Sequence, residues 1–341
     1  MEPAELPMPI PTIDDLTQRL GFRPPDDLVR LFKLAHELDP KGRYNGLDPF
    51  NLGYIDSVLG PEASPDRWDT YPDQPIECFA IAHSGIGNFV PVILVDDPDN
   101  NPDDCLFAWW ASGQYLLFYA DGIVDSIAQY GVDTSEDLDD LLNDSDRDQF
   151  ERCLAAFERE FGIKPPPPTQ NPNDEIALQN RDIALTISDG PSYEGSIAAF
   201  ERRLARPGIL PTADGAGALV PDDKTDRAYL REFQDDRTRR NKLPRDERDI
   251  AVQTIIAKAR DRLNTGESGT ALVVARDLWG DFCGGESPES LAITQLLIDA
   301  YTALDRPLLA RRARARMDWV IEVDREFEER RKRREREQPE D

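Results

Sequence analysis

The segment from Ala82 to Gly87 reads Ala-His-Ser-Gly-Ile-Gly and places a serine beside a histidine and two glycines. The nucleophile elbow of many hydrolases has the pattern Gly-x-Ser-x-Gly at a sharp turn between a strand and a helix. Here the residue two before Ser84 is Ala82 and the residue two after it is Ile86, and strands are predicted on both sides. This segment therefore does not predict a serine hydrolase.

Acidic side chains alternate along residues 97–103, which read Asp-x-Asp-x-Asn-x-Asp. This is the spacing of the first half of an EF-hand calcium loop, which also needs glycine at position six and glutamate at position twelve. Pro102 and Ala108 stand at those two positions, so an intact EF-hand is excluded. Weak calcium binding by this acidic loop stays open.

Other signatures of catalysis or cofactor binding are missing from the sequence. It has no phosphate-binding Gly-x-x-x-x-Gly-Lys, no dinucleotide-binding glycine motif and no His-Glu-x-x-His. The histidines are only His36 and His83, and no two cysteines have the spacing of a zinc site. We therefore expect no catalytic residue, no metal and no cofactor, and reduced cysteines at Cys78, Cys105, Cys153 and Cys283. An enzyme of an unrecognised class is the third and least favoured alternative.

The charge is large and unevenly distributed. The formal net charge is −27, and residues 1–164 hold 33 acids against 11 bases. Between Arg67 and Arg147 there are 17 acids and no lysine or arginine. Such a surface repels nucleic acid and anionic membranes but attracts a basic protein and speeds its encounter. The alternative is that the acidity serves solubility alone.

The distribution of apolar residues and the composition of the first residues indicate where in the cell the protein is expected. No apolar run approaches the roughly 18 residues of a membrane-spanning helix. The first residues contain neither the basic nor the apolar region of a secretory signal. The expected location is the cytoplasm. The sequence does not specify an oligomeric state.

Residues 13–162 predict an α+β domain in which helices pack on an antiparallel sheet. A helix begins after Thr12 and ends at Gly21, and a second follows Pro25. Apolar runs bounded by turn residues predict strands at 76–82, 89–95, 106–110 and 115–119. Further helices are expected at 123–130 and 149–161. Residues 1–12 are rich in proline and are expected to be flexible.

Four prolines at 165–168 begin a predicted linker over residues 163–175. Residues 176–325 predict an all-α domain of helical hairpins, followed by a charged tail at 326–341. Ala275-Arg-Asp-Leu-Trp279 matches Ala315-Arg-Met-Asp-Trp319 at an offset of 40 residues. A repeated pair of helices at a fixed period indicates a helical-repeat module, loosely similar to TPR repeats.

The N-terminal half resembles the SMI1/KNR4 superfamily, also called SUKH. The helix segment Pro25–Phe32 resembles the early family helix, and Phe79–Val95 with Gly85-x-Gly87 resembles the central hairpin. The segment 106–130 resembles the closing strands and helix, whereas Pro24 replaces the usual leucine and the loop 39–75 is long. The resemblance implies a curved antiparallel sheet with packed helices. It also implies a non-enzymatic role, as in bacterial immunity proteins that neutralise toxins.

The first hypothesis is therefore an immunity-type or adaptor protein whose acidic domain captures and occludes a basic partner such as a bacterial toxin. Adjacent strand residues point to opposite faces, so one of the two neighbouring tryptophans is expected in the core and the other as an exposed anchor. The predicted partner-binding residues are Asp69, Asp73, Asp96, Asp97, Asp99, Asp103, Asp104, Trp109 and Trp110. The alternative hypothesis is a helical-repeat scaffold that binds partners through its C-terminal half.

Overall fold

The structure is a computed structural model, and its chain divides into two compact units. The first comprises residues 1–64 and 77–217, and the second comprises residues 65–76 and 218–341. The residues that it describes are 10–38, 58–59, 62–68, 74–82, 89–111, 115–118, 120, 122–128, 144–162, 197–282 and 287–337. The predicted linker at 163–175 lies outside them.

Two helices open the first unit with the caps that the sequence predicts. Helix α1 (Ile13–Leu20) begins at Thr12, whose hydroxyl accepts from the Asp15 amide while the Asp15 carboxylate accepts from the Thr12 amide. It ends at Gly21, which adopts a left-handed φ of 83°. Helix α2 (Asp26–Leu38) buries its leucine and phenylalanine stripe. These helices therefore supply part of the core of the unit.

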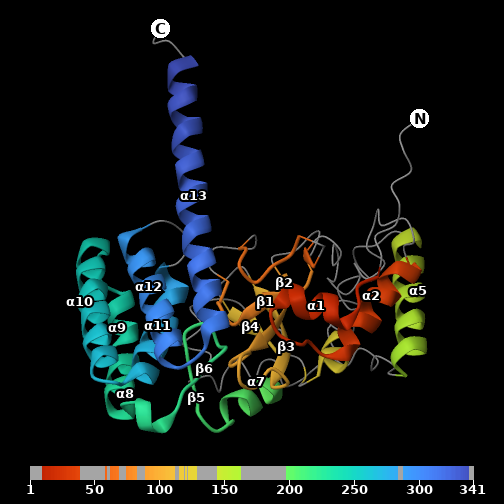
Figure 1. The fold of residues 1–341 in the computed structure, drawn as a ribbon, viewed down its shortest axis with the longest axis horizontal. Helices are drawn as coiled ribbons and strands as arrows, with labels where there is room; N and C mark the ends of the chain where they lie inside the picture. The colour runs from red at the N-terminus through yellow and green to blue at the C-terminus, as the bar shows by residue number, and fades with distance from the viewer. Residues whose placement is uncertain are drawn as a thin grey trace. The chain divides into compact units, whose positions relative to one another are not determined.

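The central sheet is an antiparallel meander of four strands in the order β1-β2-β3-β4. Its strands are β1 (Cys78–Ala80), β2 (Phe89–Val95), β3 (Cys105–Ala111) and β4 (Tyr115–Leu117). The long central pair aligns Phe89 with Ala111 and Val95 with Cys105. This register places the loop 96–104 directly between the ends of β2 and β3. The expected antiparallel sheet with helices is thus present in the N-terminal part (Figure 1).

Helices that follow the sheet complete the first unit. Residues 123–128 are helical, and α5 (Asp144–Phe161) packs against α2, where Arg30 pairs with Glu160. Helix α7 (Ile197–Leu204) and the short strand β5 (Ile209–Leu210) also belong to this unit. The amide of Leu116 in β4 donates to the carbonyl of Asp214 at 3.0 Å, so the segment after α7 extends along the edge of the sheet.

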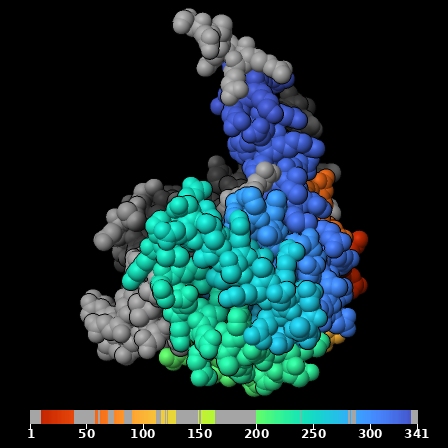
Figure 2. Space-filling view, turned by 90° about the vertical axis from the view of Figure 1, so that its left-hand side faces the viewer, coloured from red at the N-terminus to blue at the C-terminus, as the bar shows by residue number. Residues whose placement is uncertain are grey.

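The second unit is helical. After β6 (Ala218–Leu219) and a 3-10 turn at Asp222–Lys224, its helices are α8 (Arg227–Asp235), α9 (Arg237–Asn241), α10 (Arg245–Asn264), α11 (Ser268–Phe282), α12 (Pro288–Ala303) and α13 (Pro307–Glu337). Each helix from α10 to α13 packs against the next. Figure 2 shows the face that carries α10 and α12, with α13 rising beyond it. A helical C-terminal region is therefore present as predicted, although α7 joins the first unit and the short strands β5 and β6 lie within the segment that was expected to be all-α.

The two matched tryptophan segments both lie on helices, as their repeat predicts. Trp279 lies on α11 and Trp319 on α13, each on the second helix of a consecutive pair. Their surroundings differ, because Trp279 is fully buried and Trp319 is half-buried. The guanidinium of Arg316 stacks on the Trp279 ring at 4.7 Å and donates to Thr294 at 3.0 Å.

A short segment from the N-terminal half belongs to the helical unit. In residues 65–76, Trp68 and Ile76 are almost fully buried. Arg312 of α13 lies over the Trp68 ring at 5.2 Å and donates to the Ile76 carbonyl at 3.1 Å. Arg311 pairs with Asp66 at 3.6 Å. The chain therefore enters the second unit, leaves it after Ile76 and re-enters it at Ala218.

Candidate functional site

The acidic loop, residues 96–104 between β2 and β3, is built from two successive turns. The Asn101 amide donates to the Asp97 carbonyl at 2.8 Å, and the Asp104 amide donates to the Asn101 carbonyl at 3.2 Å. The Asp97 carboxylate accepts from the side-chain amide of Asn100 at 3.0 Å. Asparagine and aspartate favour such turns because their short side chains bond to nearby groups. The loop therefore has a defined shape.

The first acid of the loop is buried. Asp96 is 3% exposed, and its two carboxylate oxygens accept from Arg203 of α7 at 2.5 and 2.6 Å. The Arg203 Nε donates to the carbonyl of Ala216 at 2.8 Å. This bidentate geometry is the strongest form of an arginine–carboxylate contact. The expectation that Asp96 belongs to a partner-binding surface is wrong, because an arginine of the same chain occupies its carboxylate.

The last acid of the loop also bonds to α7's end. Asp104 forms an ion pair with Arg206, and both side chains are about one third exposed. Next to it, burial and the charge of Asp104 raise the pKa of the Cys105 thiol to about 11. A thiol with a raised pKa is a poor nucleophile and metal ligand at neutral pH. The Cys105 thiol is thus almost entirely protonated at neutral pH.

The middle of the loop carries the accessible acids. Asp99 and Asp103 are exposed and Asp97 is half-buried. Solvent reaches these three carboxylates, and their assignment to a partner-binding surface stays a prediction. The sequence did not reveal the two arginines on and just after α7, because Arg203 lies 107 residues from Asp96 and Arg206 lies 102 residues from Asp104. No local pattern indicates such a pairing.

Both predicted tryptophan anchors are in the core. Trp109 is 0% exposed and Trp110 is 2% exposed, although they point to opposite faces of β3. Phe107 stacks edge-on against Trp109, with ring centroids 4.6 Å apart, and Ala108 is buried beside Trp110. Because both faces of the strand are covered, the prediction of one exposed tryptophan is wrong.

Other predicted residues lie outside the described part of the chain. Asp69 and Asp73 are in this group, and so is the segment that contains His83 and Ser84. Among the described residues, no group of three histidine, cysteine or carboxylate side chains is arranged to hold a metal ion. Within the same residues, no helix combines the length and apolarity needed to cross a membrane.

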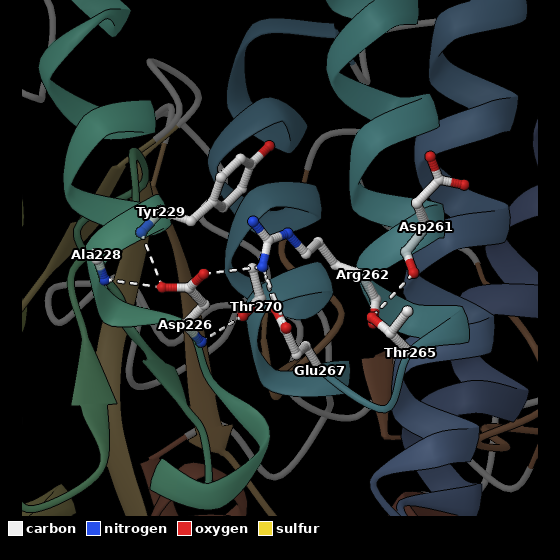
Figure 3. A network of polar contacts seen from close by, with 8 residues as sticks. All are labelled: Asp226, Ala228, Tyr229, Asp261, Arg262, Thr265, Glu267 and Thr270. Carbon is white, nitrogen blue, oxygen red and sulfur yellow. Dashed lines mark hydrogen bonds and ion pairs between the residues drawn. The ribbon is translucent and has the colours of Figure 1, made fainter.

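A second polar cluster lies in the helical unit and has a structural role (Figure 3). Asp226 caps α8 by accepting from the amides of Ala228 and Tyr229, and these bonds hold the pKa of its carboxyl below the usual range. Arg262 of α10 bridges Asp226 at 2.8 Å and Glu267 at 2.9 Å. The Asp226 amide donates to Thr270 of α11 at 2.7 Å. These contacts fasten the start of α8 to α10 and α11.

The second unit also buries charged groups between its helices. Asp277 of α11 lies 3.6 Å from both Arg237 and Arg240 of α9, and all three are nearly buried. Burial lowers the pKa of Arg276, which is fully enclosed. Arginine retains its charge even when its pKa falls, so Arg276 stays protonated at neutral pH.

In comparisons with known proteins, no family model and no curated protein matches the chain. The resemblance to the SMI1/KNR4 superfamily therefore stays a prediction.

Proposed function

We propose that this chain is a non-enzymatic protein-binding protein whose acidic first unit captures a basic partner. The observation that carries the proposal is that some acids of the acidic loop are bound to arginines of the same chain and others are open to solvent. Asp96 is bound to Arg203 of α7 and Asp104 to Arg206 just after that helix, whereas Asp97, Asp99 and Asp103 are accessible. The outer carboxylates are thus presented on a loop whose two ends are fixed.

Fixing the loop before binding favours association, because less conformational entropy is lost when the partner arrives. The excess negative charge of residues 1–164 adds a long-range attraction for a basic surface. The resemblance to immunity proteins supports a toxin domain as the partner class. On this proposal the chain occludes the partner and carries out no reaction of its own.

The test is affinity capture from native lysate, followed by kinetics with the purified partner. The test variant replaces Asp97, Asp99 and Asp103 with asparagine. An asparagine at position 97 keeps one side-chain oxygen to accept from Asn100. The control variant makes the same change in net charge on α5 through Asp148→Asn, Glu151→Gln and Glu158→Gln, three exposed positions.

We expect the wild type and the α5 variant to capture the same basic protein, and the loop variant to bind it much more slowly. Association with the wild type should also slow steeply with salt, since the Debye length shrinks from about 10 Å at 0.1 M to about 3 Å at 1 M. If both variants associate equally slowly with the partner, the net charge of the chain governs the rate of association and the position of the charges does not. Unchanged binding by the loop variant at low salt would refute the proposed surface.

The second candidate is a helical scaffold, which the successive packing of α10 to α13 favours. The matched positions of Trp279 and Trp319 on two consecutive helix pairs agree with a repeat module. Capture that both triple variants retain, and that salt does not weaken, would favour this alternative.

A further inference from the structure

Helix α13 continues well beyond its packed part. Up to Val320 it buries Leu309, Ala313, Arg316 and Val320, which lie three or four residues apart on the face that α12 covers. From Ile321 to Arg334 every side chain is exposed or half-exposed. At 1.5 Å per residue, these 14 residues extend for about 21 Å. Figure 2 shows this free end of α13 as a blue column rising past the other helices of the unit.

The same face continues along the free end. Spacings of three and four residues place Asp324, Phe327, Arg331 and Arg334 in line with the buried row that ends at Val320. Phe327 is 63% exposed, and the neighbouring Ile321 is 46% exposed. Both belong to the small set of large apolar side chains that are exposed in the described chain. The free end therefore carries a face that is suited to packing.

Charge along the free end falls into two opposite blocks. Residues 318–329 contain six acids and one base, whereas residues 330–336 contain six bases and one acid. Each block is about two to three helical turns long. A run of five consecutive bases at 330–334 stands out in a chain whose net charge is −27.

We propose that the free end of α13 pairs with the free end of α13 in a second copy of this chain, in antiparallel orientation. Antiparallel pairing sets the acidic block of each helix against the basic block of the other, about a two-fold axis near Glu329 and Arg330. Parallel pairing would place the two acidic blocks against each other and the two basic blocks against each other. Because the contact is self-complementary, it closes as a two-fold dimer and does not continue into a filament.

The same register pairs specific residues across the axis. Asp324 of one copy faces Arg334 of the other, and Glu328 faces Arg331, so each contact occurs twice. Phe327 lies between them, where the stems of the opposing arginines cover its ring. Within one copy, Glu328 already pairs with Arg331 at 2.9 Å and Glu326 with Arg330 at 2.9 Å. The side chains of these two intrahelical pairs are about half exposed or more, and such pairs exchange partners easily.

The test is sedimentation of the full chain as a function of concentration and salt. Variant A carries Asp324→Arg and Glu328→Arg, and variant B carries Arg331→Glu and Arg334→Glu. The control variant carries Glu322→Arg and Glu329→Arg, the same change as variant A on the opposite face of the helix. Circular dichroism checks that the helix content is unchanged.

We expect the wild type and the control variant to dimerise and to dissociate as salt is raised. Variants A and B should each dimerise at least about tenfold more weakly, because like charges then face each other. An equimolar mixture of A and B should restore dimers, since every reversed charge then meets its opposite.

Two results would overturn the proposal. The first is a wild type that stays monomeric at low salt and high concentration. The second is loss of association in variant B with normal association in variant A. That pattern would mean that the basic run binds the acidic unit of the second copy and not its α13.

Discussion

Replacing Arg203 with methionine is the sharpest test of how α7 is held in the first unit. Methionine keeps most of the volume of the arginine stem but removes the guanidinium. The Asp96 carboxylate would then remain buried without the two bonds of 2.5 and 2.6 Å that it accepts. The Ala216 carbonyl would lose its donor as well.

The expected loss in the free energy of unfolding follows from the burial of both side chains of the ion pair. The side chains of Arg203 and Asp96 are 1% and 4% exposed. Removing one member of a buried, hydrogen-bonded ion pair costs about 3–5 kcal/mol, most of which is the penalty of leaving the other charge unpaired. The matched control is Arg206→Met. The side chains of Arg206 and its partner Asp104 are 29% and 33% exposed. We therefore expect the free energy of unfolding to fall by about 1 kcal/mol or less.

The measurement is urea unfolding, followed by tryptophan fluorescence at neutral pH. Adding Asp96→Asn to Arg203→Met should recover part of the stability, because the uncompensated charge is then removed. The slope of the unfolding transition should be similar in all variants if they unfold from the same state. Equal, small losses for Arg203→Met and Arg206→Met would refute the buried pair and the assignment of α7 to this unit.

Two further predictions follow from the same contacts. Proteolysis within 163–175 should give a nicked protein whose fragments stay together on gel filtration. The N-terminal fragment supplies Trp68 to the helical unit and the C-terminal fragment supplies α7 to the first, so clean separation of two folded fragments would contradict the structure. Cys105 should react with iodoacetamide about 100-fold more slowly at pH 8 than an ordinary cysteine, because its pKa is raised from 9.0 to about 11 and the thiolate is the nucleophile. Its rate, followed by mass spectrometry, should rise as pH approaches 11, and rapid reaction at pH 8 would count against the burial of this thiol.

Local patterns predicted the elements of the fold well. The apolar run bounded by turns at 89–95 coincides with β2, and the Thr12 and Gly21 signals coincide with the ends of α1. Such signals act within a few residues, where backbone preference and side-chain periodicity decide the structure. The helices after Pro244 were likewise visible as apolar stripes of period 3.6, whereas α8 and α9 lie in a charge-dense segment in which no such stripe was identified.

Long-range partners could not be predicted in the same way. The sequence between Arg67 and Arg147 contains no base, yet Arg203 and Arg206 bring two to its acidic loop. For the same reason, the sequence does not reveal that Asp96 is buried against Arg203 while Asp99 and Asp103 are exposed. Alternation along β3 correctly placed Trp109 and Trp110 on opposite faces, but periodicity does not reveal whether both faces are covered.

The assignment of residues 65–76 to the helical unit has a consequence for the order of events during synthesis. Ile76 lies 236 residues before Arg312, which binds its carbonyl. At about 5–20 residues per second, a ribosome needs roughly 12–50 s to make that stretch. Throughout this interval Trp68 has no α13 to pack against, so this apolar segment stays available to chaperones. The helical unit can therefore be completed only after α13 has left the ribosome, 236 residues after Ile76 of its core has been made.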